Sequence, residues 1–139
     1  MPQATEAQTQ TITPYLLYED ADAAMSWLAG SFGFREVDRM TGAAGGLHLE
    51  AEVEPGGARL YLGSPPGDFR GPARAGRTSL LYVLVDDVDQ HYLRAREQGA
   101  EIVEAVGDQP YGHRRYTCRD PQGHEWTFAT PIESEGGRV

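Results

Sequence analysis

The sequence predicts an α+β fold built from two copies of a βαβββ module. Residues 79–130 show the order strand, helix, strand and hairpin, with apolar runs of strand length around an apolar helical stripe. Residues 11–63 show the same order, displaced by 66 to 67 positions. Helix starts, helix ends and hairpin turns of the two halves coincide at this spacing. A match at all three levels indicates an internal repeat.

The repeat divides the chain into five expected segments. Residues 1–10 and 133–139 are polar and lack hydrophobic periodicity, so we expect two terminal tails. The modules are expected at residues 11–63 and 79–132. Residues 64–78 are rich in proline and glycine, which is typical of a linker.

The first module begins with a strand at residues 11–18. A helix follows through Phe32, with Asp20 as the expected N-cap and Gly33 as the residue that ends it. Its predicted buried face consists of Ala21, Ala24, Met25, Leu28 and Phe32. Strands are expected at residues 34–40, 47–53 and 58–63.

The second module repeats this order. A buried strand at residues 80–85 precedes a helix that the Asp86-Asp87 pair caps and Gly99 ends. A short strand begins at Ile102, and strands at 116–119 and 125–129 flank the turn at residues 120–123. We expect Trp126 and Phe128 in the core, Cys118 as a buried inert thiol, and His91 and His124 at the surface.

Charge and cysteine content limit the possible partners. The formal net charge is −9, which disfavours binding to nucleic acids or anionic membranes. The single cysteine excludes an internal disulfide framework and fits a reducing cytoplasm. No apolar run reaches the length of a membrane span. We therefore expect a cytoplasmic protein with no nucleic-acid or membrane partner.

Strand alternation sorts the residues of the third strand into two faces. Leu47, Leu49, Ala51 and Val53 form an apolar face, and His48, Glu50 and Glu52 form a polar one. The helix must cover the apolar face. The polar face then meets solvent or lines a concave cavity.

Several of these stretches resemble the vicinal oxygen chelate superfamily. The second module contains V-D-D-V-D before its helix, Q-G-A at the helix end, and R-D-P-Q-G-H-E-W before its last strand. T-P-Y-L near residue 13, H-L-E near residue 48 and Y-G-H-R-R from residue 111 are similar to the PhnB-like branch of glyoxalase/bleomycin-resistance proteins. The resemblance covers about residues 11–132. It implies the glyoxalase/bleomycin-resistance/dioxygenase fold and a homodimer, and leaves the chemistry open.

The resemblance also implies where a metal would bind. Metal-dependent members take ligands from the first and last strands of each module, and these positions fall on Thr13, Tyr61, Leu80 and Thr127. The internal repeat independently pairs Thr13 with Leu80 and Tyr61 with Thr127. Hydroxyl groups and a leucine are poor ligands for the transition metals concerned. We therefore expect no metal and no cofactor, and no glyoxalase I, dioxygenase or fosfomycin-transferase chemistry.

The resemblance further predicts the lining of a cavity. It points Tyr15 and Tyr82 inward and places His48, Glu50 and Arg59 around Tyr61. Because His48 and Glu50 lie about 7 Å apart on one strand face, they are candidates for an acid/base pair or for ligand contacts. The alternative is a solvated strand face. A relocated metal would need Glu52 or His113 as a further ligand.

The segment from Tyr111 to Tyr116 combines aromatic rings with His113, Arg114 and Arg115. In similar proteins it lies at the cavity mouth, where it suits stacking on a planar ligand or pairing with a carboxylate. Alternatively, its arginines pair with the protein's own carboxylates. A β-bulge would decide whether Arg114 and Tyr116 or their neighbours face the cavity.

Three functions fit these expectations. The first is a metal-free small-molecule-binding protein that sequesters an aromatic or antibiotic-like ligand by stacking and charge. The second is a metal-independent isomerase, cyclase or lyase that uses His48 and Glu50. The third is a metal-dependent lyase with relocated ligands. A homodimer is expected for all three.

Overall fold

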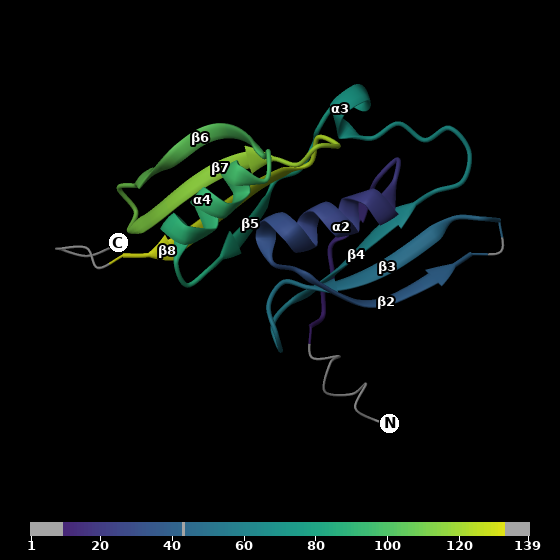
Figure 1. The fold of residues 1–139 in the computed structure, drawn as a ribbon, viewed down its shortest axis with the longest axis horizontal. Coiled ribbons are helices and arrows are strands. Elements are labelled where there is room, and N and C mark those ends of the chain that lie inside the picture. The colour runs from purple at the N-terminus through teal and green to yellow at the C-terminus, as the bar shows by residue number, and fades with distance from the viewer. Residues whose placement is uncertain (1–9, 43, 133–139) are drawn as a thin grey trace. The chain divides into compact units, whose positions relative to one another are not determined.

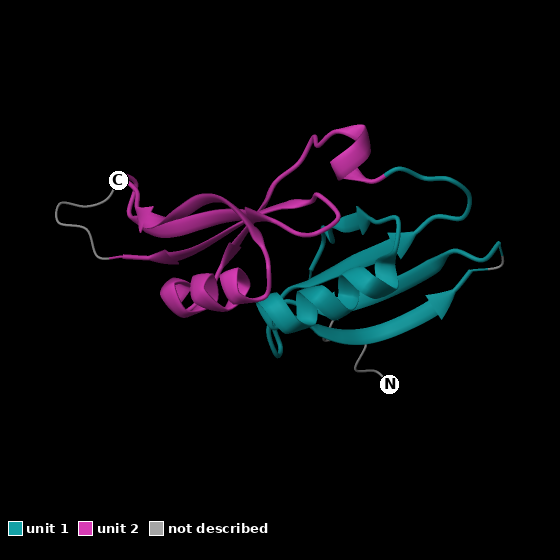
Figure 2. Cartoon of the chain, turned by 45° about the horizontal axis from the view of Figure 1, so that its top comes forward, with its two compact units in different colours: residues 1–70 teal, residues 71–139 magenta. Residues whose placement is uncertain are grey.

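The structure is a computed structural model that describes residues 10–42 and 44–132. The chain divides into two compact units, residues 1–70 and 71–139, which we call module one and module two (Figure 2). Each module is described by itself. The tails expected at residues 1–9 and 133–139 lie outside the described residues.

Module one is a four-stranded mixed sheet with a helix on one face (Figure 1). Its elements are β1 (Tyr15–Leu17), α2 (Ala21–Phe32), β2 (Arg35–Thr41), β3 (Leu47–Glu52) and β4 (Arg59–Ser64). The strand order is β1-β4-β3-β2, and β1 runs parallel to β4 while the other pairs are antiparallel.

Module two repeats this topology after a short helix. Its elements are α3 (Pro72–Ala75), β5 (Leu81–Leu84), α4 (Val88–Glu97), β6 (Glu101–Asp108), β7 (His113–Arg119) and β8 (Glu125–Pro131). The order β5-β8-β7-β6, with β5 parallel to β8, matches that of module one. The predicted α+β fold of two βαβββ modules is therefore confirmed. The expected linker contains α3, which begins at a proline whose missing N–H costs nothing at that position.

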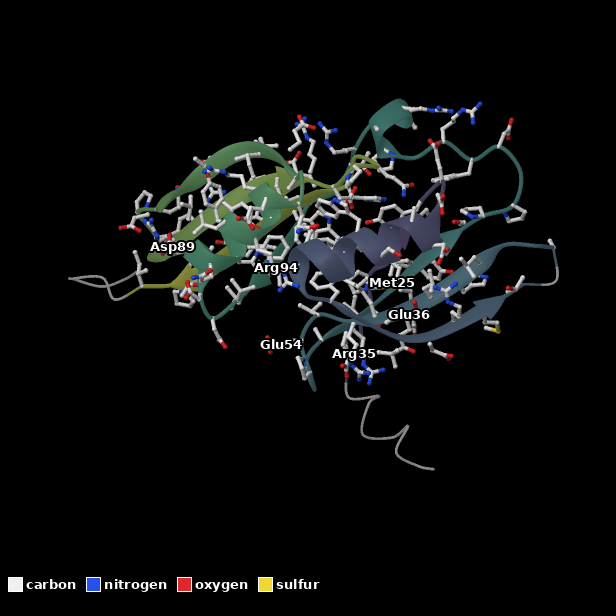
Figure 3. The ribbon with its side chains drawn as sticks, in the orientation of Figure 1. Met25, Arg35, Glu36, Glu54, Asp89 and Arg94 are labelled. Atoms are coloured by element: carbon white, nitrogen blue, oxygen red, sulfur yellow. The ribbon has the colours of Figure 1, made fainter. Side chains whose placement is uncertain are left out.

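The helix of module one begins and ends where the sequence predicts. The Asp20 carboxylate accepts a hydrogen bond from the Ala23 amide at 3.0 Å, and Gly33 closes the helix with a φ of 79°. All five residues of the predicted apolar face are buried against the sheet. Met25, labelled in Figure 3, is one of them.

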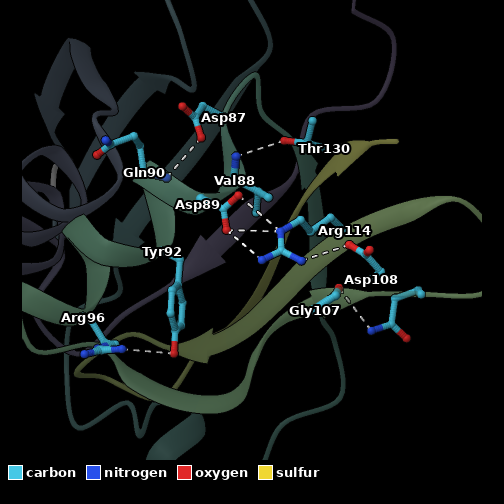
Figure 4. Close-up of polar contacts among 11 residues, drawn as sticks. Asp87, Val88, Asp89, Gln90, Tyr92, Arg96, Gly107, Asp108, Arg114 and Thr130 are labelled. Carbon is cyan, nitrogen blue, oxygen red and sulfur yellow. Dashed lines mark hydrogen bonds and ion pairs between the residues drawn. The ribbon is translucent and has the colours of Figure 1, made fainter. Parts of the chain in front are cut away.

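The helix of module two is fixed at its N-terminus by two contacts (Figure 4). Asp87 accepts a hydrogen bond from the Gln90 amide at 3.2 Å, and the Val88 amide donates to Thr130 Oγ1 at 3.0 Å. The second contact ties α4 to β8. No helix among the described residues is long and apolar enough to cross a membrane.

The core of module two is aromatic. Tyr116, Trp126 and Phe128 are fully buried, and the Trp126 and Phe128 rings stack with centroids 6.0 Å apart. Cys118 lies in the same core as a free thiol, and burial raises its pKa to about 12. The thiol is therefore protonated at neutral pH and unreactive, as predicted.

His91 corrects a prediction, because it lies on the sheet-facing side of α4 and is half-buried instead of lying at the surface. Its ring centroid is 4.0 Å from that of Phe128, and its Nδ1 is 2.5 Å from the hydroxyl of Tyr116. Burial, with a smaller contribution from Arg94, lowers the pKa of His91 to about 4. The helical spacing of Val88, His91 and Ala95 placed the imidazole on the buried stripe.

The low pKa of His91 predicts acid sensitivity. The imidazole titrates at an ordinary pH near 6.5 in the unfolded chain, so the unfolded state binds more protons between about pH 6.5 and 4. Stability should be fully present above pH 6.5 and should fall by about 3 kcal/mol as the pH drops through this window. Urea denaturation at pH 7 and pH 4.5 measures the loss. His91→Phe should remove this pH dependence of the free energy of unfolding, and His124→Gln should retain it. An equal pH dependence in both variants would contradict the assignment to His91.

A triad of charged residues on three neighbouring strands, joined by two ion pairs, recurs in both modules with opposite charges. The triad is Arg35, Glu52 and Arg59 in module one, and Glu101, Arg119 and Glu125 in module two. The central residue contacts both neighbours, at 2.9 and 3.4 Å in module one and at 3.2 and 3.1 Å in module two. The backbone register of the repeat is thus retained while each charge is exchanged.

Candidate functional site

The candidate site of module one lies on the sheet face opposite α2. Two rows of residues cross this face in register. One row runs Asp38, Glu50, Tyr61 and Tyr15, and the next runs Met40, His48, Gly63 and Leu17. We call these eight residues the module-one face. The structure thus brings together Tyr15, His48, Glu50 and Tyr61 as neighbours on one surface.

Tyr15 and His48 form a hydrogen-bonded pair on this face. The Tyr15 hydroxyl contacts His48 Nδ1, and the two rings meet edge to face with centroids 6.0 Å apart. Burial raises the pKa of Tyr15, so its hydroxyl remains protonated at neutral pH. Gly63 makes room for the phenol, since a Cβ there would lie 2.8 Å from the Tyr15 ring.

Glu50 pairs with an arginine and not with His48. Arg59 Nη1 donates to Glu50 Oε2 at 2.8 Å, and its Nη2 lies 3.4 Å from Glu52 Oε2. Glu52 is buried and also accepts from Arg35. These carboxylates are therefore balanced by guanidinium groups, and the polar partner of His48 is Tyr15.

An open hollow lies on the module-one face. Its cavity volume is about 90 Å³, and it is lined by Asp38, Arg39, Met40, His48, Leu49, Glu50 and Tyr61. Arg39 turns its guanidinium toward Glu36 and Asp22. Sequence reasoning missed Asp38 and Met40, because a bulge in β2 between Glu36 and Asp38 shifts the alternation that would have placed them.

The candidate site of module two lies on the corresponding face, opposite α4. Tyr82 of β5 and Thr127 of β8 are paired in register, as Tyr15 and Tyr61 are in module one. Tyr82 contacts His113 Nδ1 at 2.7 Å, and Tyr111 lies beside both. Arg115 and Thr117 alternate with His113 along β7. We call these six residues the module-two face.

Two other candidates of this segment lie on the opposite face of β7. Arg114 pairs with Asp89 of α4 and with Asp108, each at 3.0 Å (Figure 4). Tyr116 is buried against His91. The register thus puts Arg115 and Thr117 on the helix-free face and leaves Arg114 and Tyr116 under α4.

The four positions implied for a metal do not offer suitable ligands. Thr127 Oγ1 and Thr117 Oγ1 are 2.7 Å apart and hydrogen-bond to each other. Tyr61 presents a phenol, Thr13 an aliphatic hydroxyl and Leu80 a hydrocarbon. Within residues 10–42 and 44–132, no three His, Cys, Asp or Glu side chains gather to hold an ion. The donor chemistry of these positions does not fit a transition metal.

Comparison with known proteins assigns the family. A model of the Glyoxalase/Bleomycin resistance protein/Dioxygenase superfamily matches residues 10–128, and the chain belongs to this superfamily. The crystal structure of TioX from Micromonospora sp. ML1 is similar, with 31% identity and a TM-score of 0.70 over 88% of this chain and 99% of that chain. The uncharacterised protein Mb0911c of Mycobacterium bovis is 30% identical over 127 residues, which cover 87% of this chain and 83% of the relative.

A further solved structure bears on the branch within the family. The PhnB protein from Bacillus cereus has 18% identity and a TM-score of 0.61 over 87% of this chain and 99% of that chain. A likeness at this identity extends to the fold alone. Membership of the PhnB-like branch therefore stays a prediction.

Proposed function

We propose that the protein binds an aromatic small molecule in the hollow of module one and sequesters it without making or breaking bonds. The hollow carries this proposal, because it combines the exposed ring of Tyr61 and the Met40 side chain with polar groups at its edge. Ligand sites typically pair an apolar, aromatic lining with a few placed polar groups. We also propose that the protein is a homodimer and that its ligand is antibiotic-like.

The residues of the hollow favour a planar, positively charged ligand. Asp38 is exposed and its carboxylate accepts from the Arg39 amide, so it is available for a cation. A tyrosine ring attracts a cation over its face by about 0.5 to 1 kcal/mol at an exposed site. The net charge of −9 adds a long-range attraction.

A direct test uses the fluorescent planar cation N-methylacridinium as a probe. We expect saturable binding by fluorescence anisotropy, weakened about fivefold to tenfold by Tyr61→Ala because stacking on the ring is lost. Leu93→Ala, which truncates an exposed residue of α4, serves as the matched control and should bind as the wild type does. Undiminished binding by Tyr61→Ala, or none by the wild type, would contradict the proposal.

The enzyme alternative rests on the Tyr15–His48 pair. The hydrogen bond between the phenol and Nδ1 orients the imidazole and leaves its other nitrogen for proton transfer. Glu50 is engaged by Arg59, so the acid/base pair of this alternative becomes Tyr15 and His48. Conversion of a bound ligand, detected by mass spectrometry and lost in His48→Gln, would favour catalysis over sequestration.

A further inference from the structure

The sulfur atoms of the described residues differ sharply in their access to solvent. Met40 of β2 is 63% exposed, whereas Met25 on the buried face of α2 is 3% exposed. The thiol of Cys118 is buried in the core of module two. Oxidation of a side-chain sulfur depends on contact with the dissolved oxidant. Within residues 10–42 and 44–132, Met40 is therefore the sulfur that such an oxidant reaches first.

Met40 also lies where a change in its chemistry affects a site. It pairs in register with His48 of β3, and both side chains line the hollow of module one. Residues directly opposite each other on antiparallel strands are close side-chain neighbours on one face of a sheet. A methionine is flexible, polarizable and apolar, which suits contact with an aromatic ring. The hollow thus takes part of its apolar lining from the most exposed sulfur of the described residues.

We propose that Met40 is an oxidation site through which hydroperoxides weaken ligand binding in the hollow. The thioether sulfur attacks the terminal oxygen of the peroxide, and the O–O bond breaks. The sulfur keeps this oxygen as a sulfoxide. The proton of the same oxygen passes to the leaving hydroxide or alkoxide, which departs as water or an alcohol. The sulfur is oxidised by loss of an electron pair, and the peroxide is reduced by it.

The sulfoxide changes the polarity of the hollow. Oxidation replaces a flexible apolar side chain with a polar one and disrupts surfaces that depend on methionine contacts. An oxidised Met40 holds water at the edge of the hollow and loses its apolar contact with a planar ring. Methionine sulfoxide reductases reverse the reaction, so the modification works as a switch. The effect on the ligand rests on the function proposed for the hollow, whereas the selective oxidation of Met40 does not.

The first test locates the added oxygen and needs no ligand. The full chain is treated with hydrogen peroxide and digested with trypsin, which cleaves after Arg39 and Arg59. Met40 is then the only sulfur-containing residue of peptide 40–59, and fragment ions distinguish Met25 from Met1 in peptide 1–35. We expect Met40 to oxidise about tenfold faster than Met25 in the folded protein and at a similar rate in urea. Equal rates in the folded protein would overturn the inference.

The second test measures the affinity for N-methylacridinium by fluorescence anisotropy before and after peroxide treatment. Oxidation should weaken binding by the wild type about threefold to fivefold, and methionine sulfoxide reductases should restore it. Peroxide should leave the affinity of Met40→Leu at its own untreated value, because this variant has no sulfur at the hollow. Met25→Leu is the matched control and should respond to peroxide as the wild type does. An equal fall in Met40→Leu, or no fall in the wild type, would overturn the switch.

The two tests keep this inference apart from the proposed function. If the untreated wild type does not bind N-methylacridinium, the function proposed for the hollow is contradicted and the switch falls with it. Selective oxidation of Met40 in the same protein would still establish the modification site. Binding by the untreated wild type together with equal oxidation of Met40 and Met25 would support the proposed function and overturn the inference alone.

Discussion

Replacing Asp120 with alanine is expected to lower the free energy of unfolding by about 3 to 5 kcal/mol. The Asp120 carboxylate is buried in the turn between β7 and β8. It accepts from the Gln122 and His124 amides through Oδ1 and from Trp126 Nε1 through Oδ2, each at 3.1 Å. Alanine would leave all three donors without this acceptor. Urea denaturation followed by tryptophan fluorescence measures the loss.

Asp120→Asn provides the control for this prediction. Its amide oxygen can still accept from the two backbone amides, but its NH₂ group faces Trp126 Nε1, which is also a donor. We expect a smaller loss of about 1 to 2 kcal/mol. Equal losses in the two variants would show that the backbone bonds of the turn contribute little to stability.

Gly123→Ala is the second change with a large expected effect, a loss of about 3 kcal/mol. Gly123 has a φ of 100°, which L-residues rarely adopt. An added Cβ would also contact the backbone of Ala73 in α3, with the Ala73 Cα only 2.7 Å away. The turn and the short helix could not both keep their positions. Urea denaturation and the amide chemical shift of Ala73 report the two consequences.

Gly99→Ala separates backbone strain from this collision. Gly99 has a similar φ of 91°, but no heavy atom lies within 4 Å of a Cβ at this position. The free energy of unfolding of Gly99→Ala should therefore fall only by the cost of the left-handed backbone conformation, about 1 to 2 kcal/mol. If both variants lost the same amount, the packing of α3 on the turn would contribute nothing.

The element order was predictable because its signals are local in the sequence. Asp20 and Asp87 begin the helices as expected, since a carboxylate before an apolar stripe satisfies free amides. Because the two halves repeat at a fixed spacing, the order of elements in one module predicted the order in the other. The short helix α3 escaped prediction, because four residues beginning at Pro72 carry too little periodicity to stand out within a proline- and glycine-rich segment.

The site was less predictable, because it depends on register between strands. The alternation along β3 separated His48 and Glu50 from the apolar face correctly. It carried no information that His48 contacts Tyr15 or that Glu50 contacts Arg59, since each contact joins different strands. On β7, only the pairing with β8 settles that Arg115 lies on the helix-free face.

The exchanged ion-pair triads have a consequence for how such a duplicated protein diverges. The same three positions are filled by arginine, glutamate and arginine in one half and by the reverse pattern in the other. The triad of module one carries a net charge of +1 and that of module two a net charge of −1, and in each the central residue pairs with both neighbours, so the backbone tolerates either sign. The electrostatic potential over each half can therefore be retuned by compensating substitutions without redesign of the scaffold. A duplication of this kind yields two surfaces free to specialise toward oppositely charged molecules.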